Sequence, residues 1–315
     1  MSFPTPVRYP PPGLPESVSV YEVGARDGLQ NESVILSVEV KAEFVRRLVG
    51  AGLRTIEATS FVSPKWVPQL ADAEALLPLL PEGDALRFPV LVPNRAGLAR
   101  ARAAGASQVA VFAAATESFS RRNLNRSLDE ALAMFAPVVS EAVGARMWVR
   151  GYVSMCFGDP WEGRVPVEQV VRVAGRLMEM GCAELSVGDT IGVATPGHVH
   201  DLLGALVASG IPLAQLAVHF HDTYGQALAN TLAALEAGVT IVDASAGGLG
   251  GCPYAGSATG NLATEDLVWM LNGLGVDSGV DLGQLVQTSR WMAGHLGRPS
   301  PSRVVAALGP DPEQG

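Results

Sequence analysis

The chain has 315 residues, of which 48% are hydrophobic and 17% are charged. This hydrophobic fraction excludes a disordered chain, and the absence of a Gly-X-Y period excludes a collagen-like one. The 22 basic and 31 acidic residues give a net charge of −9 without any block of Lys and Arg, which argues against nucleic acid and anionic membranes as partners.

The N-terminal segment, residues 1–17, is predicted to be a proline-rich tail. Six of its first 15 residues are Pro, and it lacks the apolar core of a signal peptide. The three cysteines are an odd number, which favours a reducing compartment over a secreted disulfide scaffold. The longest apolar stretch, residues 202–218, is broken by glycines and a proline, so no membrane span is expected. We therefore expect a cytoplasmic location.

Five times along the chain, an amphipathic segment ends in Gly and a short run rich in β-branched residues follows. The glycines are Gly52, Gly105, Gly181, Gly210 and Gly238. A glycine just past a helix supplies the left-handed residue that closes the last turn. Each run that follows is then predicted to be a buried strand. Three further strands are predicted at residues 17–23, 87–93 and 146–155.

The segments between the predicted strands have the spacing of amphipathic helices. One covers residues 37–52, and a second, residues 128–139, follows a capping box from Ser127 to Glu130. A third covers residues 197–210, behind Thr195 as an N-cap hydroxyl and Pro196 at the first helical position.

Alternating strands and helices predict an α/β fold. The eight strands, near residues 20, 57, 90, 110, 150, 186, 219 and 242, predict a (β/α)8 TIM barrel over residues 18–300. Additional C-terminal helices are expected beyond residue 265, followed by a tail at 301–315. A doubly wound open sheet is the competing topology, but no dinucleotide-binding fingerprint follows the first strand.

Unusual polar residues collect at the ends of these strands, where a barrel of this kind carries its catalytic groups. The first strand ends in Arg26-Asp27, the second carries Glu57, the sixth ends at Asp189, and the seventh carries His219 and His221. The eighth runs into the glycine-rich segment 247–251, then Cys252 and, further on, Asn261.

His219 and His221 are two residues apart on a predicted strand. This spacing places both rings on one face, about 7 Å apart along the chain. They are therefore either two ligands of one metal or two core histidines bonded to backbone. His198 and His200 have the same spacing on a predicted helix, where i and i+2 share no face, so we expect them at the surface.

Asp27 and Asn261 offer a carboxylate and an amide oxygen to the same cation. Together with two imidazoles they leave open positions in an octahedron, which suits Mg²⁺ or Mn²⁺ holding a chelating substrate. Two histidines and one carboxylate also suit Fe(II) in an oxygenase or Zn²⁺ in a hydrolase. The ligand types alone therefore do not define the reaction.

Two other features each allow two interpretations. Arg26 either forms a salt bridge to Glu57 or Asp189, or serves as a fixed cation beside a developing oxyanion. The glycine-rich segment 247–251 is either a phosphate-binding nest or a mobile lid, and the lid is favoured because Cys-Pro-Tyr follows rather than a helix N-terminus. On a lid, Cys252 is predicted to transfer a proton, whereas most cysteines are inert.

Five long motifs resemble those of the 3-hydroxy-3-methylglutaryl-CoA lyases, in the metal-dependent TIM-barrel lyase superfamily. The similarity is collinear from about residue 18 to residue 275. The motifs are EVGARDGLQNE (22–32), EATSFVSPKWVPQL (57–70), SVGDTIGVATPG (186–197), HFHDTYGQALANT (219–231) and GGLGGCPYAGSATGNLATEDLV (247–268).

The resemblance implies a site and a reaction. It implies that Asp27, His219, His221 and Asn261 hold the divalent cation, Mg²⁺ or Mn²⁺. It implies that Arg26, Glu57, Asp189 and Cys252 are catalytic or polar groups of the active site, and Asp27, Glu57 and His219 are the candidates for the general base. The implied reaction is cleavage of 3-hydroxy-3-methylglutaryl-CoA, an acyl-CoA thioester, to acetyl-CoA and acetoacetate.

Three alternatives stay open at this point: a lyase for a longer branched 3-hydroxyacyl-CoA, an acetyl-CoA condensing synthase, and a metal-binding scaffold without activity. The extra C-terminal helices suggest a homodimer. The chain departs from the family's pattern at Ala25, where Pro is common. It also has Asp159-Pro160-Trp161-Glu162-Gly163 where Cys-Pro-Tyr-Glu-Gly is common, which puts a carboxylate and a larger ring near the mouth of the barrel.

Overall fold

A single parallel sheet forms the centre of the computed structural model, which describes residues 4–251 and 260–308. Its strands follow the order β2-β1-β9-β8-β7-β6-β5-β4-β3, so strands consecutive along the chain are paired, except for β2 and β3. The strands are β1 (Ser19–Glu22), β2 (Thr55–Ile56), β3 (Thr59–Ser60), β4 (Val90–Leu91), β5 (Gln108–Ala114), β6 (Trp148–Ser154), β7 (Glu184–Asp189), β8 (Leu216–Phe220) and β9 (Ile241–Ala244). This order lacks the reversal that defines a doubly wound sheet.

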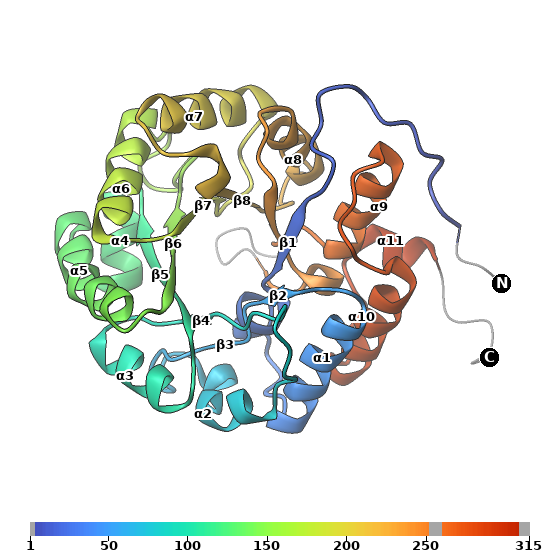
Figure 1. Cartoon of the computed structure of the whole chain (residues 1–315), viewed down its shortest axis with the longest axis horizontal. Coiled ribbons are helices and arrows are strands. Elements are labelled where there is room, and N and C mark those ends of the chain that lie inside the picture. The colour runs from blue at the N-terminus through green and yellow to red at the C-terminus, as the bar shows by residue number, and fades with distance from the viewer. Residues whose placement is uncertain (1–3, 252–259, 309–315) are drawn as a thin grey trace.

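The two ends of this strand order meet along the chain. Only Glu57 and Ala58 separate β2 from β3, while β2 pairs with β1 and β3 pairs with β4. Figure 1 shows the strands around a common centre with the helices outside them. The architecture is therefore TIM-barrel-like, and each predicted strand coincides with an observed strand or strand pair.

The helices form the outer layer of the molecule and follow the strands in alternation. They are α1 (Val38–Gly50), α2 (Ala73–Leu76), α3 (Arg95–Ala103), α4 (Glu117–Leu124), α5 (Leu128–Gly144), α6 (Val167–Met180), α7 (Pro196–Ala208), α8 (Ala227–Glu236), α9 (Thr264–Leu274), α10 (Leu282–Leu296) and α11 (Arg303–Ala307). The last three lie together on one side of the ring (Figure 1): α9 and α10 match the helices expected beyond residue 265, whereas α11 lies within the segment 301–315 that was expected to be a tail.

The five glycines predicted to close helices all have left-handed backbone. Their φ angles lie between 91° and 107°, a region that L-residues with a side chain rarely adopt. At Gly52 there is a second reason for glycine, because a Cβ there would collide with the carbonyl oxygen of Gly279. The chain can therefore turn from each helix directly into the next strand.

Helix capping agrees with the sequence at one helix and differs at another. The Ser127 side chain accepts from the backbone N–H of Glu130, whose carboxylate accepts from the N–H of Ser127, as predicted for α5. Thr195 precedes α7 as expected, but its side chain makes no capping hydrogen bond, so the predicted hydroxyl cap is wrong. Pro196 begins the helix as predicted, and its lack of an N–H removes one of the donors that the first turn would leave unpaired.

The interior of the ring contains charged side chains as well as apolar ones. Arg150, on β6, is fully buried and contacts the ring of Tyr21 on β1 and the carboxylate of Asp243 on β9. Since β6 is hydrogen-bonded to neither of those strands, these contacts cross the centre of the barrel. The main apolar core lies between the sheet and the helices, with Phe44, Phe135 and Leu206 among its buried members.

Parts of both segments expected to be tails pack against α9. Arg8 donates to the carbonyl oxygen of Gly275 at 2.7 Å, and the backbone N–H of Tyr9 donates to that of Gly273 at 2.8 Å. At the other end, Ser302 and Val304 donate to the carboxylate of Asp266, which holds α11 in place.

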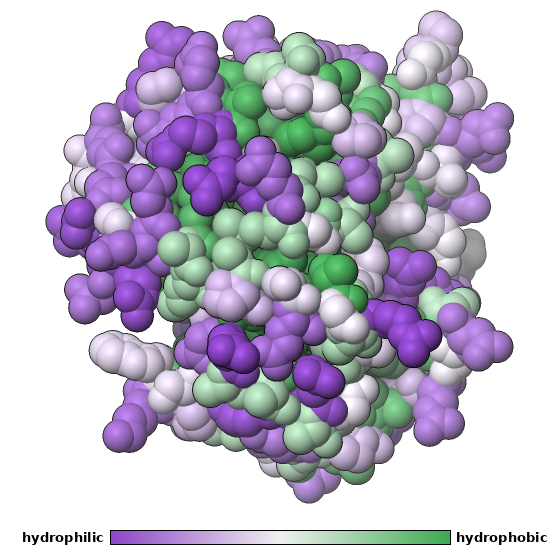
Figure 2. All heavy atoms as spheres, turned by 60° about the vertical axis from the view of Figure 1, so that its left-hand side comes forward, coloured by the Kyte–Doolittle hydropathy of each residue, from purple (hydrophilic) through white to green (hydrophobic). Residues whose placement is uncertain are grey.

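Hydrophilic side chains cover much of the left-hand edge of the face in Figure 2, and hydrophobic ones show in the recesses between them. Within residues 4–251 and 260–308, none of the helices combines the length and the apolarity needed to cross a bilayer.

Candidate active site

Arg26 lies between two carboxylates at the carboxyl end of β1. The strand leads into one π-helical turn, η1 (Gly24–Gly28), which presents Arg26 and Asp27. The guanidinium donates to Glu57 Oε2 through Nε at 2.9 Å, and Nη2 lies 2.7 Å from the same oxygen. Its Nη1 donates to Asp27 Oδ1 at 2.7 Å. The salt bridge predicted for Arg26 is thus made to Glu57 and also to Asp27.

Three potential metal ligands converge beside this pair. Asp27, His219 and His221 each place a ligand atom within 4.8 Å of the others, and the two imidazole centroids are 5.2 Å apart. The strand spacing of the histidines therefore brings both rings to one point, as expected from their alternation. His198 and His200 do not join them, because His198 is half-buried against Phe157 and His200 is exposed beside Glu236.

Asn261 completes the cluster from the segment that follows β9. Its Nδ2 donates to Asp27 Oδ2 at 2.8 Å, and its backbone forms an isolated bridge with His221. Asn261 Oδ1 and His221 Nδ1 are buried and lack hydrogen-bond partners among the described residues. Buried polar atoms are rarely left unpaired, so these two atoms point to a bound group.

The charge states in this cluster suit a cation. Burial alone would raise the pKa of Asp27, but Arg26 and the histidines outweigh it and lower the value to about 2. Burial lowers the pKa of His221 to about 3, assisted by the neighbouring His219. A carboxylate and a neutral imidazole are the protonation states in which these side chains bind metals.

Gly250 shapes the wall next to Asn261. Its φ of 95° is left-handed, and a Cβ at this position would lie 2.7 Å from Asn261 Nδ2. The same Cβ would lie 3.3 Å from Gly28, on the segment that carries Asp27. Glycine is therefore required here for Asn261 to approach Asp27.

Glu57 is held from two sides in the buried interior. Tyr152 donates its hydroxyl to Glu57 Oε2 at 2.9 Å, the oxygen that Arg26 also contacts. Burial raises the pKa of Glu57, although Arg26 opposes that rise. Glu57 Oε1 is buried and lacks a partner in the part of the chain that the structure describes.

Asp189 shapes the turn after β7. Its Oδ1 accepts from the backbone N–H of Val193 at 3.0 Å and its Oδ2 from that of Ala194 at 2.9 Å. Burial raises the pKa of this carboxyl group to about 6 against the effect of those hydrogen bonds. The side chain is almost fully buried, so in this conformation it organises backbone at the rim of the site.

The glycine-rich segment binds carboxylates through its backbone amides. The turn η5 (Ala246–Gly248) donates the N–H of Ala246 to Glu22 at 2.8 Å and the N–H of Gly247 to Glu265 at 2.8 Å. These two amides are therefore already occupied by acids of the chain itself and do not form the phosphate nest considered above. Cys252, the predicted proton carrier, lies outside the described residues.

The departure at residues 159–163 does not present a free carboxylate. Asp159 is buried, accepting the Thr116 hydroxyl at 2.6 Å and the backbone N–H groups of Trp161 and Glu162. The Trp161 ring is partly exposed and stacks with the guanidinium of Arg122 at 4.3 Å.

Three further residues of the interior lie within strands rather than at their ends, so a search for polar residues at strand ends does not find them. Arg150 and Tyr152 stand two apart on β6, and Asp243 lies within the apolar β9. Asp243 Oδ1 accepts from Arg150 Nη2 at 2.5 Å, and Oδ2 lies 3.3 Å from His219 Nδ1. The available signal was a charged residue inside an otherwise apolar strand, which is costly unless the charge is paired.

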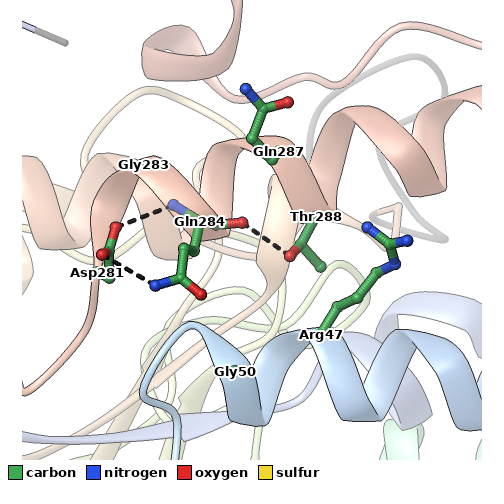
Figure 3. Close-up of a pocket in the computed structure, with 7 residues that line it drawn as sticks. All are labelled: Arg47, Gly50, Asp281, Gly283, Gln284, Gln287 and Thr288. Carbon is green, nitrogen blue, oxygen red and sulfur yellow. Dashed lines mark hydrogen bonds between the residues drawn. The ribbon is translucent and has the colours of Figure 1, made fainter. Parts of the chain in front are cut away.

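A pocket of about 480 Å³ lies elsewhere, between α1 and α10 on the outside of the barrel (Figure 3). Three of its polar residues interact with one another at the start of α10. Asp281 accepts from the N–H and the side-chain amide of Gln284, and Thr288 donates to the carbonyl oxygen of Gln284. This pocket contains none of the clustered ligands and is not the catalytic site.

The fold and the cluster define a class: a TIM-barrel-like enzyme whose polar groups gather at the carboxyl end of the strands. The sequence matches the HMGL-like family over residues 17–292. It is 53% identical to the mitochondrial hydroxymethylglutaryl-CoA lyase of Arabidopsis thaliana over 94% of this chain and 63% of that protein, so it spans less than two thirds of that relative. It is 52% identical to the mitochondrial enzyme of Mus musculus over 93% of this chain and 90% of that one.

Solved structures agree with these relatives. Hydroxymethylglutaryl-CoA lyase from Pseudomonas aeruginosa superposes with a TM-score of 0.92 at 46% identity, covering 94% of this chain and 98% of that chain. An HMG-CoA lyase from Acinetobacter baumannii, in complex with coenzyme A and 3-methylmalate, superposes with a TM-score of 0.88 at 34% identity, covering 95% of this chain and 97% of that chain. The chain belongs to the HMGL-like family and is a carbon–carbon lyase of the hydroxymethylglutaryl-CoA lyase type.

Proposed function

We propose that the chain cleaves 3-hydroxy-3-methylglutaryl-CoA to acetyl-CoA and acetoacetate with a divalent cation, Mg²⁺ or Mn²⁺, held by Asp27, His219, His221 and Asn261. The cleavage follows from the family; the cation site is the part argued from geometry. Its main support is the convergence of Asp27, His219 and His221 within 4.8 Å. The unpaired Asn261 Oδ1 beside them supplies the fourth donor.

The donor set fits a hard or borderline cation. Two imidazoles, one carboxylate and one amide oxygen suit Mg²⁺ or Mn²⁺, and fewer than six protein ligands leave positions for a chelating substrate. When bound, such a cation polarises the oxygens of the substrate as a Lewis acid.

The side chains supply the remaining chemistry. The acceptor for the proton of the 3-hydroxyl is one of Asp27, Glu57 or His219, which Arg26 and the cluster bring together. After the C2–C3 bond breaks, Arg26 stabilises the enolate oxygen of the acetyl thioester as a fixed cation. Cys252 delivers the proton to the enolate carbon, and Asp189 maintains the rim of the site.

The proposal extends to the form of the enzyme. Since β2 and β3 are separated by two residues and pair on opposite sides, they count as one strand of an eight-stranded (β/α)8 barrel. The enzyme is cytoplasmic, in keeping with its odd number of cysteines, and a homodimer. The CoA thioester is its substrate, which is consistent with the coenzyme A bound to the Acinetobacter relative.

An acetoacetate-release assay tests this function. Purified protein treated with a chelator is expected to release acetoacetate from 3-hydroxy-3-methylglutaryl-CoA only after Mg²⁺ or Mn²⁺ is added back. Asn261→Ala is expected to raise the cation concentration required, whereas Asn272→Ala, in α9, is not. Release that is independent of the cation, or preference for a longer branched acyl-CoA, would contradict the proposal.

A further inference from the structure

We propose that Asp243 is the positioning residue that fixes the tautomer of His219, so that Nε2 carries the lone pair offered to the cation. The inference rests on the proposed cation site and deepens it, because it names a residue that is not itself a ligand. The observation behind it is the contact of Asp243 Oδ2 with His219 Nδ1 at 3.3 Å.

The sheet register places these two side chains opposite each other. His219 on β8 and Asp243 on β9 are direct partners across the parallel ladder, so both project from the same face. Asp243 is fully buried and the His219 side chain is 13% exposed. The contact is therefore shielded from water and set by backbone pairing.

The surroundings of Asp243 leave it only the role of an acceptor. Its Oδ1 accepts from Arg150 Nη2 at 2.5 Å, and its Oδ2 accepts from the hydroxyl of Ser186 at 2.9 Å. Arginine has no acceptor atom and stays charged in proteins. The His219 Nδ1 that meets Oδ2 must therefore carry its proton to form a hydrogen bond.

Arg150 is itself immobilised, which fixes Asp243 in turn. Its guanidinium lies 3.6 Å from the Tyr21 ring centroid and 4.8 Å from that of Tyr152. Glu184 contacts its Nε at 3.1 Å from the other side. The clamp is made of strands β1, β6, β7 and β9, so it is part of the barrel rather than of a loop.

The consequence for His219 follows from proton counting. A neutral imidazole has one proton, and when Nδ1 holds it the Nε2 lone pair is free to bind a cation. Carboxylates that accept from metal-binding histidines commonly fix the ring in this way, and removing one lowers metal affinity about 10- to 100-fold.

Asp243→Asn reverses this arrangement with almost no change in shape. Because Arg150 can only donate, the new amide oxygen must face it, and the NH₂ group must face Ser186 and His219. His219 Nδ1 then has to accept, which moves the imidazole proton to Nε2 and blocks the lone pair. We expect Mn²⁺ binding by the metal-free protein to weaken about 10- to 100-fold.

Glu184→Gln is the matched control. It neutralises the other carboxylate on the same arginine without touching His219, and Mn²⁺ affinity is expected to stay within about twofold of that of the unmodified protein. Asp243→Asn binding Mn²⁺ as tightly as Glu184→Gln would overturn the proposal.

A second measurement reads the tautomer without any metal. In ¹⁵N-histidine-labelled metal-free protein at about pH 8, above the ordinary pKa of imidazole, the His219 signal should show a proton on Nδ1. A proton on Nε2 in the unmodified protein would refute the inference even if Asp243→Asn fails to fold. If instead the tautomer is as stated but Mn²⁺ does not bind the unmodified protein, the cation site fails and the assignment of Asp243 as its support falls with it.

Discussion

Two sets of carboxylates near the carboxyl end of the barrel have pKa values that are shifted in opposite directions. Asp27 and Asp243 each contact an arginine. Glu22 and Glu265 contact backbone N–H groups and hydroxyls: Glu22 accepts from Gly24, Ala246 and Thr264, and Glu265 accepts from Gly247 and Ser289.

Burial disfavours the charge on all four groups, and the arginines decide the outcome. Arg26 and Arg150 lower the pKa values of Asp27 and Asp243 against the effect of burial. Without such a partner, burial raises the pKa of Glu22 to about 7 and that of Glu265 to about 8. Of these four groups, only the two beside a guanidinium have a pKa below the ordinary value, and Glu57 shows that burial can outweigh an arginine, because its pKa is raised although Arg26 contacts it.

The comparison predicts the largest loss of stability when the arginine that contacts a carboxylate of the first set is removed. Arg150→Met would leave the fully buried Asp243 and the half-buried Glu184 without their cation, which costs about 3–5 kcal/mol of unfolding free energy. Urea denaturation measures it. The control Arg172→Met breaks an exposed pair with Asp129 and should cost less than about 1 kcal/mol. Equal costs for the two variants would show that burial of the pair is irrelevant.

The second prediction concerns Arg26, the other arginine of this set. Arg26→Met should lower kcat about 10²- to 10³-fold, as the loss of one donor to a developing oxyanion does. Since all four proposed ligands remain, Mn²⁺ binding should persist. Steady-state kinetics and Mn²⁺ titration measure both quantities, with Arg121→Met on the exposed face of α4 as the control. Turnover close to that of the unmodified protein would remove Arg26 from the mechanism.

The first set also marks what can be predicted from sequence. Arg26 and Asp27 could be predicted because they follow the first predicted strand, and His219 because it lies on a strand that begins soon after the closing glycine Gly210. That rule depends only on local pattern and on the geometry common to parallel barrels. Five of the eight predicted strands follow such a glycine, and all eight coincide with an observed strand or strand pair.

Asp243 and Arg150 could not be placed in this way. They are 93 residues apart, and their contact depends on which side chains of β6 and β9 point across the interior at the same height. Strand register is set by the tertiary structure and not by local sequence. The same holds for the amides of η5, which bind Glu22 and Glu265 and not a phosphate. Similarly, no local signal shows that the Thr195 hydroxyl leaves α7 uncapped.

The second set predicts that stability falls as pH rises. The folded state holds the proton on Glu265 up to about pH 8, whereas the unfolded chain releases it near 4.5. The unfolded state therefore binds fewer protons across this interval, and the unfolding free energy declines by on the order of 1 kcal/mol per pH unit.

Glu265→Gln removes this titration, so its decline between about pH 5.5 and pH 8.5 should be shallower. Chemical denaturation across that range measures the slope. Glu141→Gln, a more exposed carboxylate paired with Arg95, is the control and should leave the slope unchanged. Parallel slopes for all three proteins would mean that Glu265 is ionised in the folded state after all.

The smallest expected effect concerns a hydroxyl donor of the second set, whose carboxylates contact no arginine. Thr264 donates to Glu22 Oε2 at 2.6 Å, which favours the ionised form of that carboxyl group. Thr264→Val should cost about 1 kcal/mol, the typical value of one hydrogen bond. The loss should grow with pH. Removing the hydroxyl raises the pKa of Glu22 further, so ionisation of that carboxyl group costs more free energy in the folded variant.

Thr231→Val makes the comparison quantitative. Thr231 is also buried, but it donates to the backbone carbonyl of Ala227, which does not titrate. Its cost should therefore be the same at about pH 5.5 and pH 8.5, while that of Thr264→Val increases. If both losses are independent of pH, the hydroxyl does not tune Glu22, and the contrast between the two sets reduces to the arginines alone.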